Sequence, residues 1–237
     1  MKTSVVAGLT DLGFRAQLQA GQLGRRLLQL VTGLVVFGLS IALMISSDLG
    51  AAPWDVFHTG LTNYVPLSIG QVTIAVSFVI LLVWLALGER MGVGTIGNAV
   101  IVGASADVFL ALIDTPTSVV WRIALLLAGI TVNAFATAVY VGAQLGRGPR
   151  DGLMTGIARR TDWSIRSVRT VLELMVIAAG LALGGVAGVG TIAYALLIGP
   201  LAQWMIPKFA IKLSSYAAAS AVPPGDLVTR VSFDAIT

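Results

Sequence analysis

Two aspartates in largely apolar surroundings each follow a proline by two positions, as Pro53-x-Asp55 and Pro149-x-Asp151. Proline suits the first turn of a helix, because its missing N–H group is not needed there. A carboxylate two residues later can accept hydrogen bonds from free N–H groups and interacts favourably with the positive end of the helix dipole. Each motif therefore predicts a short helix, and two interpretations stay open. Either the aspartates are caps, or the two helices enter a bilayer from opposite faces and direct their N-termini at a central site.

The same spacing of glycine, proline, aspartate and threonine surrounds both motifs, and a shared site between the short helices would be built from these residues. The candidate substrate-site residues are Gly50, Pro53, Asp55, Thr59, Gly146, Pro149, Asp151 and Thr155. His58, the only histidine, follows Asp55 by three positions, so the two side chains are expected to share a helix face. Met154 occupies the corresponding position in the second motif.

Two charged side chains, Asp107 and Arg122, fall at similar depths in successive apolar stretches. Ionisable groups inside a membrane are costly, and they are candidates for function by default. We expect an ion pair between Asp107 and Arg122, with Asp48 and Asp114 as competing partners.

A second charged pair, Arg169 and Glu173, lies four residues apart on an expected helix, a spacing that permits side-chain contact. Two interpretations apply to this pair and to Asp107 and Arg122. The charges are structural pairs near the membrane interfaces, or they couple transport to a proton or another cation.

The composition of the 237-residue chain is that of an integral membrane protein, with 57% hydrophobic and 11% charged residues. Soluble domains carry about 25% charged residues, so a soluble domain, a disordered chain and a nucleic-acid-binding module are excluded. The absence of cysteine and the single histidine exclude disulfides, thiolate chemistry and multi-histidine metal sites. No nucleophile–base pair or cofactor motif is visible, and we expect no enzymatic activity, cofactor or metal.

Six stretches are long and apolar enough to cross a bilayer as helices. They cover residues 27–47, 68–88, 94–113, 119–143, 170–187 and 189–207. With the N-terminus placed in the cytoplasm, fourteen of the fifteen Lys and Arg residues fall on the cytoplasmic side, and Arg122 alone falls outside. Basic loops remain cytoplasmic, so we expect a multi-pass bacterial inner-membrane protein with both termini in the cytoplasm.

The chain matches itself without a gap when it is shifted by 96 residues. Residues 48–61 align with residues 144–157, and residues 85–96 align with residues 181–192. Coinciding Pro, Asp, Thr and Gly positions in loops do not follow from apolar composition, so we interpret the match as a duplication. Each copy holds three spans, an odd number, and the second copy must therefore be inverted. Inverted repeats are typical of secondary transporters, although channels also have them.

The pattern L-G-x-x-P-x-D-x-x-x-x-G, followed later by G-x-G-T, resembles the bacterial YczE/YyaS/YitT-like membrane proteins, with the YczE branch closest. The residues that carry this resemblance are Leu49, Gly50, Pro53, Asp55, Gly60, Gly92, Gly94 and Thr95. It covers residues 26–208 and implies a multi-pass bacterial inner-membrane protein, but the family has no agreed substrate or catalytic residues. Thr95 and Thr191 are also expected to help cap the helices that begin beside them.

These observations predict an all-α integral membrane protein with six transmembrane helices in two inverted-topology three-helix repeats, each with a short proline-started half-helix after its first span. The expected parts are a cytoplasmic N-terminal segment (1–25), repeat 1 (26–112), repeat 2 (119–208) and a flexible cytoplasmic tail (213–237).

The leading functional hypothesis is a transporter or permease for an unidentified small solute or ion, acting at the interface of the repeats. The alternative is a non-transporting accessory or regulatory protein that assembles with a partner. The expected partners are the lipid bilayer, anionic lipid head groups at the basic residues between 147 and 169, and a second copy or another membrane protein. Nucleic acid is not an expected partner.

Overall fold

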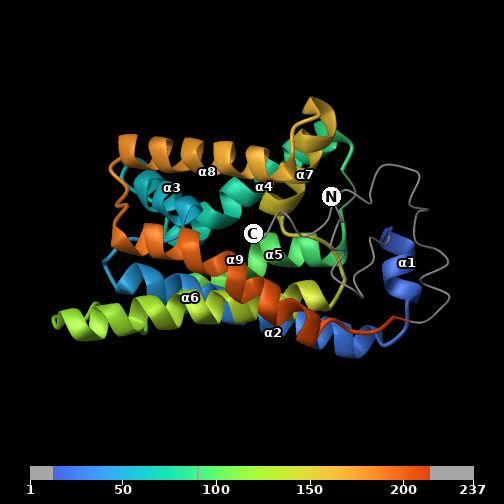
Figure 1. Ribbon diagram of the computed structural model, residues 1–237, viewed down its shortest axis with the longest axis horizontal. Coiled ribbons are helices and arrows are strands. Elements are labelled where there is room, and N and C mark those ends of the chain that lie inside the picture. Colours follow the sequence, from blue (N-terminus) through green and yellow to red (C-terminus); the bar gives the residue numbers. More distant parts are fainter. Residues whose placement is uncertain (1–12, 90, 214–237) are drawn as a thin grey trace.

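The computed structural model describes residues 13–89 and 91–213, and the regular elements in this part of the chain are helices (Figure 1). They are α1 (Phe14–Gln19), α2 (Leu23–Ser46), α3 (Pro53–Leu61), α4 (Ile69–Leu87), α5 (Val93–Leu110), α6 (Val119–Gly142), α7 (Pro149–Thr161), α8 (Ile165–Ala182) and α9 (Val189–Phe209). Almost all of the expected tail lies outside the described residues. Five helices are long and apolar enough to cross a membrane, namely α2, α4, α5, α6 and α9. The 18-residue α8 carries three charged residues and is not among these five.

The short helices begin where the sequence predicts, because α3 starts at Pro53 and α7 starts at Pro149. The helices that follow them begin after a serine. Ser68 precedes α4 and Ser164 precedes α8, and each hydroxyl accepts a hydrogen bond from the backbone N–H three residues later, at 3.1 and 3.0 Å. Serine at this position satisfies one of the free N–H groups of the first turn.

Threonine caps the last helix of each half of the chain, as predicted. The backbone N–H of Gly92 donates to Oγ1 of Thr95 at 3.1 Å, and that of Gly188 donates to Oγ1 of Thr191 at 3.2 Å. The glycine-rich sequences are therefore turns that lead into α5 and α9.

The helix expected over residues 170–187 begins and ends about one turn earlier, as α8. Ser164 caps its start, so the charged residues that follow Ser164 are helical. At the other end, Gly184 has a φ of +82°, which breaks the helical path after Ala182. Hydropathy alone had placed this helix too far along the chain, because it passed over the charged first turns.

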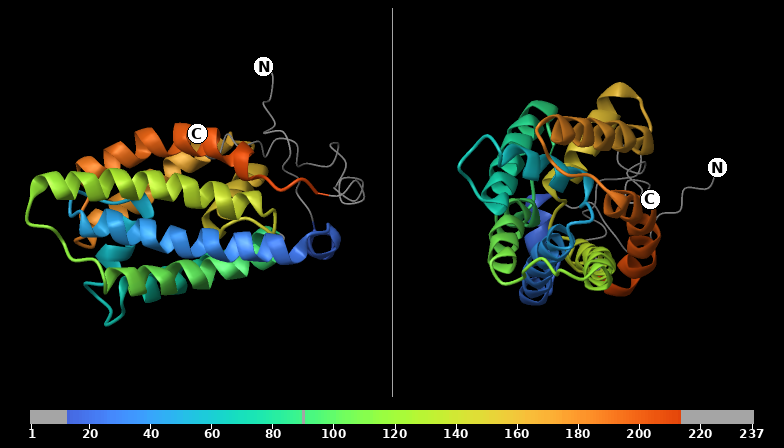
Figure 2. Two further views of the ribbon diagram at one scale, coloured as in Figure 1. Left: turned by 90° about the horizontal axis from the view of Figure 1, so that it is seen from below. Right: turned by 90° about the vertical axis from the view of Figure 1, so that its left-hand side faces the viewer.

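The long helices run side by side along the long axis of the molecule (Figures 1 and 2). The packing is α2 against α5 and α6, α9 against α6, α4 against α5 and α7, and α8 against α3 and α7. In Figure 1, α3 lies in the left half and α7 in the right half, so the short helices follow one another along this axis. Within the described residues, α8 and α9 have no contact comparable to that between α4 and α5.

Glycines bring backbones together at two of these helix contacts. A Cβ atom on Gly70 of α4 would lie 2.1 Å from the carbonyl oxygen of Gly103 in α5. A Cβ atom on Gly180, near the end of α8, would lie 2.7 Å from the backbone nitrogen of Phe57 in α3. Small residues favour such close packing in membranes. α4 is thus joined to α5, and the C-terminal end of α8 is joined to α3.

Two buried or partly buried arginines make the same contact in the two halves of the chain. Nε of Arg26 donates to the carbonyl oxygen of Ala143 at 2.8 Å, and Nε of Arg122 donates to that of Ser47 at 2.8 Å. In each case the arginine belongs to the first long helix of one half, and the carbonyl lies just before the short helix of the other half. Arg122 lies 96 positions after Arg26, and Ala143 lies 96 positions after Ser47. The arginine and the carbonyl group have therefore exchanged halves between the two contacts.

Two backbone hydrogen bonds are related in the same way. The N–H of Gly94 in α5 donates to the carbonyl oxygen of Leu145, and the N–H of Gly190 in α9 donates to that of Leu49, both at 2.7 Å. Each bond ties the start of the last helix of one half to the turn before the short helix of the other. The position of each short helix is therefore fixed by the opposite half of the chain.

Candidate functional site

The turns before α3 and α7 have backbone conformations that favour glycine. Gly50 has a φ of +101° and Gly146 a φ of +125°. A Cβ atom on Gly50 would also lie 2.5 Å from the backbone nitrogen of Gly188, so conformation and space both require glycine there. The two predicted glycines therefore permit the turns that lead into α3 and α7.

The start of α7 is anchored by Trp84 of α4. The indole Nε1 of Trp84 donates to the carbonyl oxygen of Pro149 at 2.8 Å. A Cβ atom on Gly152 would lie 1.8 Å from the Trp84 ring, so the first turn of α7 rests directly on the indole. Trp84 is 1% exposed, and the first turn of α7 is consequently held in the interior of the bundle.

The N-terminal turns of α3 and α7 meet at Trp54, Asp55 and Arg150. Nη2 of Arg150 lies 3.8 Å from Oδ1 of Asp55, and its guanidinium carbon lies 5.1 Å from the centre of the Trp54 ring. Trp54 and Arg150 both directly follow the proline of their motif, and their numbers differ by 96. The side chain of Asp55 is 2% exposed and that of Arg150 is 23% exposed, so solvent reaches the cation but hardly the carboxylate.

His58 lies beside Asp55, as predicted from their spacing. Its Nδ1 is 3.6 Å from Oδ1 of Asp55 and 3.0 Å from Oγ1 of Thr73 in α4. The Thr73 hydroxyl donates to the carbonyl oxygen of Ile69 at 2.9 Å, which uses its single hydrogen. With the Thr73 hydrogen directed at Ile69, the Nδ1–H tautomer of His58 donates to Thr73 and leaves the lone pair of the neutral ring on Nε2.

Three buried polar atoms at this junction have no hydrogen-bond partner among the described residues. They are Nε1 of Trp54, Oδ1 of Asp55 and Nε2 of His58. A buried polar atom without a partner costs about 1–3 kcal/mol, so most native structures avoid it. Their concentration on one short helix marks this junction as the candidate binding site.

The corresponding aspartate of α7 has a different partner. Oδ2 of Asp151 accepts a hydrogen bond from the hydroxyl of Tyr140 in α6 at 3.0 Å. In these contacts neither aspartate caps its own helix. Asp151 contacts the phenol of Tyr140, whereas Asp55 contacts Arg150 and His58. Each carboxylate therefore has a side-chain partner on another helix.

A polar network from α2, α6 and α9 lies next to these charges. Nδ2 of Asn133 donates to Oγ of Ser40 at 2.8 Å, and the hydroxyl of Tyr194 donates to Oδ1 of Asn133 at 3.3 Å. The charged groups that act electrostatically on the Tyr194 hydroxyl are Arg169, Asp55, Glu173 and Arg150. The Tyr194 hydroxyl therefore lies within electrostatic range of the junction and of the charged pair on α8.

Two predicted site residues, Thr59 and Thr155, bond to their own helices. Their hydroxyls donate to the carbonyl oxygens of Val56 and Gly152, both at 3.1 Å. Oγ1 of Thr155 also accepts from Nη1 of Arg147 at 3.3 Å. The structure thus brings Asp55 to the junction, whereas the hydroxyls of the two threonines donate to the backbone of their own helices.

The expected ion pair between Asp107 and Arg122 is not formed. Arg122 pairs with Asp48, the competing partner, whose carbonyl group its guanidinium also contacts. Asp107 instead accepts from the Ser68 hydroxyl and, at 2.7 Å, from the N–H of Gly70. A carboxylate is stabilised at a helix N-terminus. Asp107 therefore bonds to the start of α4 and not to Arg122.

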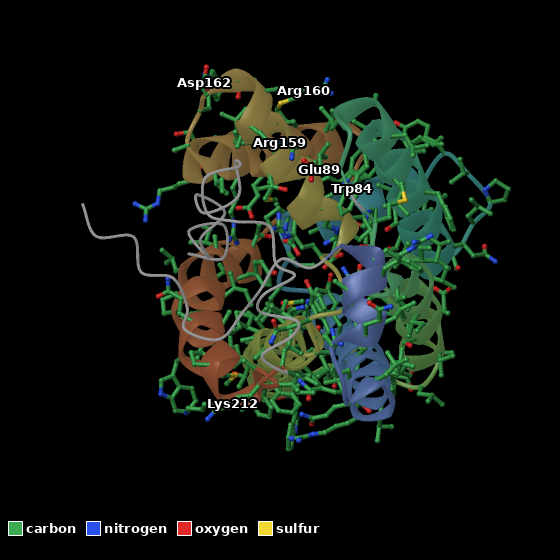
Figure 3. The ribbon with its side chains drawn as sticks, turned by 90° about the vertical axis from the view of Figure 1, so that its right-hand side faces the viewer. Trp84, Glu89, Arg159, Arg160, Asp162 and Lys212 are labelled. Atoms are coloured by element: carbon green, nitrogen blue, oxygen red, sulfur yellow. The ribbon has the colours of Figure 1, made fainter. Side chains whose placement is uncertain are left out.

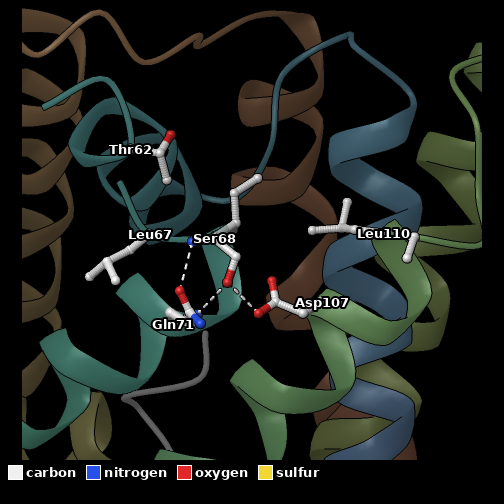
Figure 4. A pocket seen from close by; sticks show the side chains of 8 residues that line it. Thr62, Leu67, Ser68, Gln71, Asp107 and Leu110 are labelled. Carbon is white, nitrogen blue, oxygen red and sulfur yellow. Dashed lines mark hydrogen bonds between the residues drawn. The ribbon is translucent and has the colours of Figure 1, made fainter. Parts of the chain in front are cut away.

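Asp107 also faces an open hollow of about 610 Å³ at the end of α4 (Figure 4). The hollow is lined by Thr62, Leu67, Ser68, Ile69, Gln71, Asp107, Leu110 and Ala111. The carboxylate of Asp107 is already bonded to α4, so this hollow is a surface feature separate from the junction. The other expected contact, between Nε of Arg169 and Oε1 of Glu173, is confirmed at 2.9 Å.

Residues 24–207 match the family of unknown function DUF6198. The chain belongs to this family. An uncharacterized protein of Haemophilus influenzae is 36% identical to the DUF6198 chain over 75% of this chain and 81% of the relative. The uncharacterized membrane protein YczE of Bacillus subtilis is 33% identical over 79% of this chain and 87% of its own length. The uncharacterized protein YyaS of the same organism is 26% identical over 74% of this chain and 89% of its own length.

No solved structure matches this DUF6198 protein. The relatives confirm the resemblance to YczE and YyaS that the loop motifs indicated. With the name of YczE and the apolar helices described above, they establish a multi-pass membrane protein.

Arg150 was not among the predicted site residues and was counted only with the basic residues that orient the chain. Sequence analysis also missed Trp54 and Tyr194. One available signal was that Trp54 and Arg150 occupy the same position in the two motifs. Corresponding residues of an inverted duplication lie near each other when they are close to the axis that relates the copies. Tyr194 had no such signal, because its neighbours come from distant helices.

Proposed function

We propose that this DUF6198 protein is a bacterial inner-membrane transporter that moves a small solute or ion through the junction of α3 and α7. The observation that carries the proposal is the buried charged cluster there, with three polar atoms that have no partner in the described structure. Ionisable groups inside a membrane protein are expensive and mark substrate or ion pathways.

The proposed architecture has six spans, with α8 as the sixth, in two inverted three-helix repeats. The paired contacts of Arg26 with Arg122 and of Gly94 with Gly190 support it, because both recur with a shift of 96 and exchanged halves. In transporters of this construction, discontinuous helices direct their N-termini at a site near the bilayer midplane. The meeting of the N-terminal turns of α3 and α7 at Arg150 supports this proposal.

The proposed orientation places the basic end of the molecule in the cytoplasm. Figure 3 views that end, where Arg159 and Arg160 of α7 lie near Glu89. Arg159 pairs with Glu89 at 2.5 Å, and Arg160 donates to a backbone carbonyl at 2.7 Å. Exposed basic side chains at the cytoplasmic surface of a membrane attract anionic lipid head groups, which are the proposed lipid partners.

Accessibility of the junction from both sides of the membrane tests the transport proposal. The chain contains no cysteine, so a single cysteine can be introduced into an otherwise natural background. Ala52, the residue before α3, is 4% exposed and a conservative site for Ala52→Cys. We expect a membrane-impermeant maleimide to label it slowly in both right-side-out and inside-out vesicles, because a transporter exposes its site alternately. Leu34→Cys, in the packed core at 0% exposure, is the control that should resist both treatments.

Labelling of Ala52→Cys from neither side, or from one side only, would contradict transport. The first of these results would favour the alternative of a non-transporting accessory protein, whose interior has no need to open. The names of these homologues state no activity, so they do not decide between the two functions.

A further inference from the structure

We infer that the junction of α3 and α7 binds a small monovalent carboxylate together with one proton, with Arg150 holding the carboxylate and His58 taking the proton. The inference rests on the proposed function and makes its substrate class specific. It starts from the same three buried atoms without partners, Nε1 of Trp54, Oδ1 of Asp55 and Nε2 of His58.

The hydrogen-bond donors at the junction suit a carboxylate. Asp55 approaches Arg150 only to 3.8 Å, which is longer than a hydrogen bond, so it leaves the guanidinium N–H groups available. Nε1–H of Trp54 is a second donor, and the guanidinium stacks over the same indole at 5.1 Å. A guanidinium offers two parallel N–H groups to a planar carboxylate, which gives both affinity and orientation. Since Arg150 is 23% exposed, a small anion can reach it.

The proton acceptor is Nε2 of His58. Thr73 holds Nδ1–H through the 3.0 Å contact, so the lone pair of the neutral ring is on Nε2, where no protein group meets it. A proton taken from water by Nε2 converts the ring to an imidazolium. That cation lies 3.6 Å from Oδ1 of Asp55 and is stabilised by it.

Charge balance couples the two binding events. Before protonation, Asp55 and Arg150 together carry no net charge, and an added anion would be repelled by the buried carboxylate. After protonation, Asp55 is shared between His58 and Arg150, and the junction carries one net positive charge. An uncompensated charge is strongly disfavoured in a buried site, so one monovalent anion restores neutrality. By reciprocity, the bound anion raises the proton affinity of the junction by the same factor.

The charged groups that act electrostatically on His58 are Asp55 and Arg150, the two that are counted in this balance. From α8, Arg169 and Glu173 pair with each other at 2.9 Å. From α7, Asp151 is bonded to the phenol of Tyr140, and from α9 the phenol of Tyr194 is bonded to Asn133. From α4, the neighbouring group is the uncharged hydroxyl of Thr73.

Proton uptake by the purified full-length protein in lipid nanodiscs tests the inference. Sodium acetate is added near neutral pH in weak buffer with a pH-indicator dye, and acetate binding is followed in parallel by calorimetry. We expect about one proton to be taken up for each acetate bound. We also expect acetate affinity to fall about tenfold per pH unit once His58 is neutral, because one proton is linked to one anion. Sodium formate, the smaller carboxylate, should behave in the same way.

Three variants separate the roles of the two residues. His58→Met copies Met154, its counterpart in α7, and should leave only weak, pH-independent acetate binding without proton uptake. Arg150→Gln should abolish binding, whereas Arg150→Lys keeps the charge without the fork and should weaken binding about tenfold. Arg159→Gln, on the same helix but outside the junction, is the matched control and should retain proton uptake. Helical circular dichroism and thermal unfolding establish that each variant is folded.

The inference is overturned if neither acetate nor formate binds, if binding proceeds without proton uptake, or if folded Arg150→Gln binds as well as the natural protein. The transport proposal can be contradicted independently of the binding site. One-sided labelling of Ala52→Cys together with coupled acetate and proton binding would remove the transport proposal and keep the site. Two-sided labelling without coupled binding would do the reverse.

Discussion

Arg26 is a fully buried arginine whose guanidinium is bonded to backbone carbonyls. Its Nε and Nη2 donate to Ala143 at 2.8 Å and to Gln144 at 2.6 Å, and Nη1 donates to Gln17. Replacing it by Arg26→Met would leave three buried carbonyl groups without these donors, and unsatisfied buried polar groups cost about 1–3 kcal/mol each. We therefore expect the free energy of unfolding to fall by at least about 3 kcal/mol.

Thermal unfolding of the detergent-solubilised protein measures this loss, with the neighbouring, exposed Arg25→Met as control. Arg25 contacts Gln22 at 3.2 Å on the surface, and its replacement should change stability by less than about 0.5 kcal/mol. Equal effects of the two substitutions would contradict a positioning role for Arg26 at the turn before α7.

Side-chain contacts were predictable where they depend on local spacing. Glu173 lies one helical turn from Arg169, and His58 one turn from Asp55, so helix geometry sufficed. The contact of Arg150 with Asp55 joins residues that are 95 positions apart in the chain. It depends on how two short helices meet, and neither composition nor helix periodicity carries that information.

Among the elements, the contact between α4 and α5 depends on backbone proximity at Gly70. Its Cβ would lie 2.1 Å from a backbone oxygen, so Gly70→Ala must push the two helices apart. We expect the free energy of unfolding to fall by about 1–3 kcal/mol, the usual range for overpacking. The matched control is Gly97→Ala on α5, where the nearest atom would be 3.4 Å away and where alanine favours the helix.

Unfolding in increasing sodium dodecyl sulfate, followed by circular dichroism, compares these two variants. Gly97→Ala should be neutral or slightly stabilising, and a loss as large as that of Gly70→Ala would show that the helix contact is not the cause. The starts of α3, α5 and α7 were predicted from proline and threonine signals, because these act within one turn. The packing partners of the helices were not readable, since apolar faces in a membrane protein look alike from composition.

At the scale of the whole molecule, the proposed topology places the α5–α6 loop outside and the α7–α8 loop inside. Leu112 is 73% exposed in the first loop, and Trp163 is 56% exposed in the second. In intact cells, an impermeant maleimide should label Leu112→Cys and spare Trp163→Cys, because the reagent reaches only the outer face. Permeabilised cells should yield label at both positions, which serves as the control. Labelling of both cysteines in intact cells would contradict the inverted arrangement.

The glycine contact between α4 and α5 has a consequence for how the protein moves. The residue 96 positions after Gly70 is Arg166, at the start of α8, so the second half cannot form the same backbone contact with α9. The opposite end of α8 is held against Phe57 at Gly180. One end of α8 is thus fixed on α3, and the other packs on α7 through the buried side chains of Ile165 and Val168. We expect any movement of α8 to carry α3 and α7 with it rather than α9, because α8 packs on the two short helices.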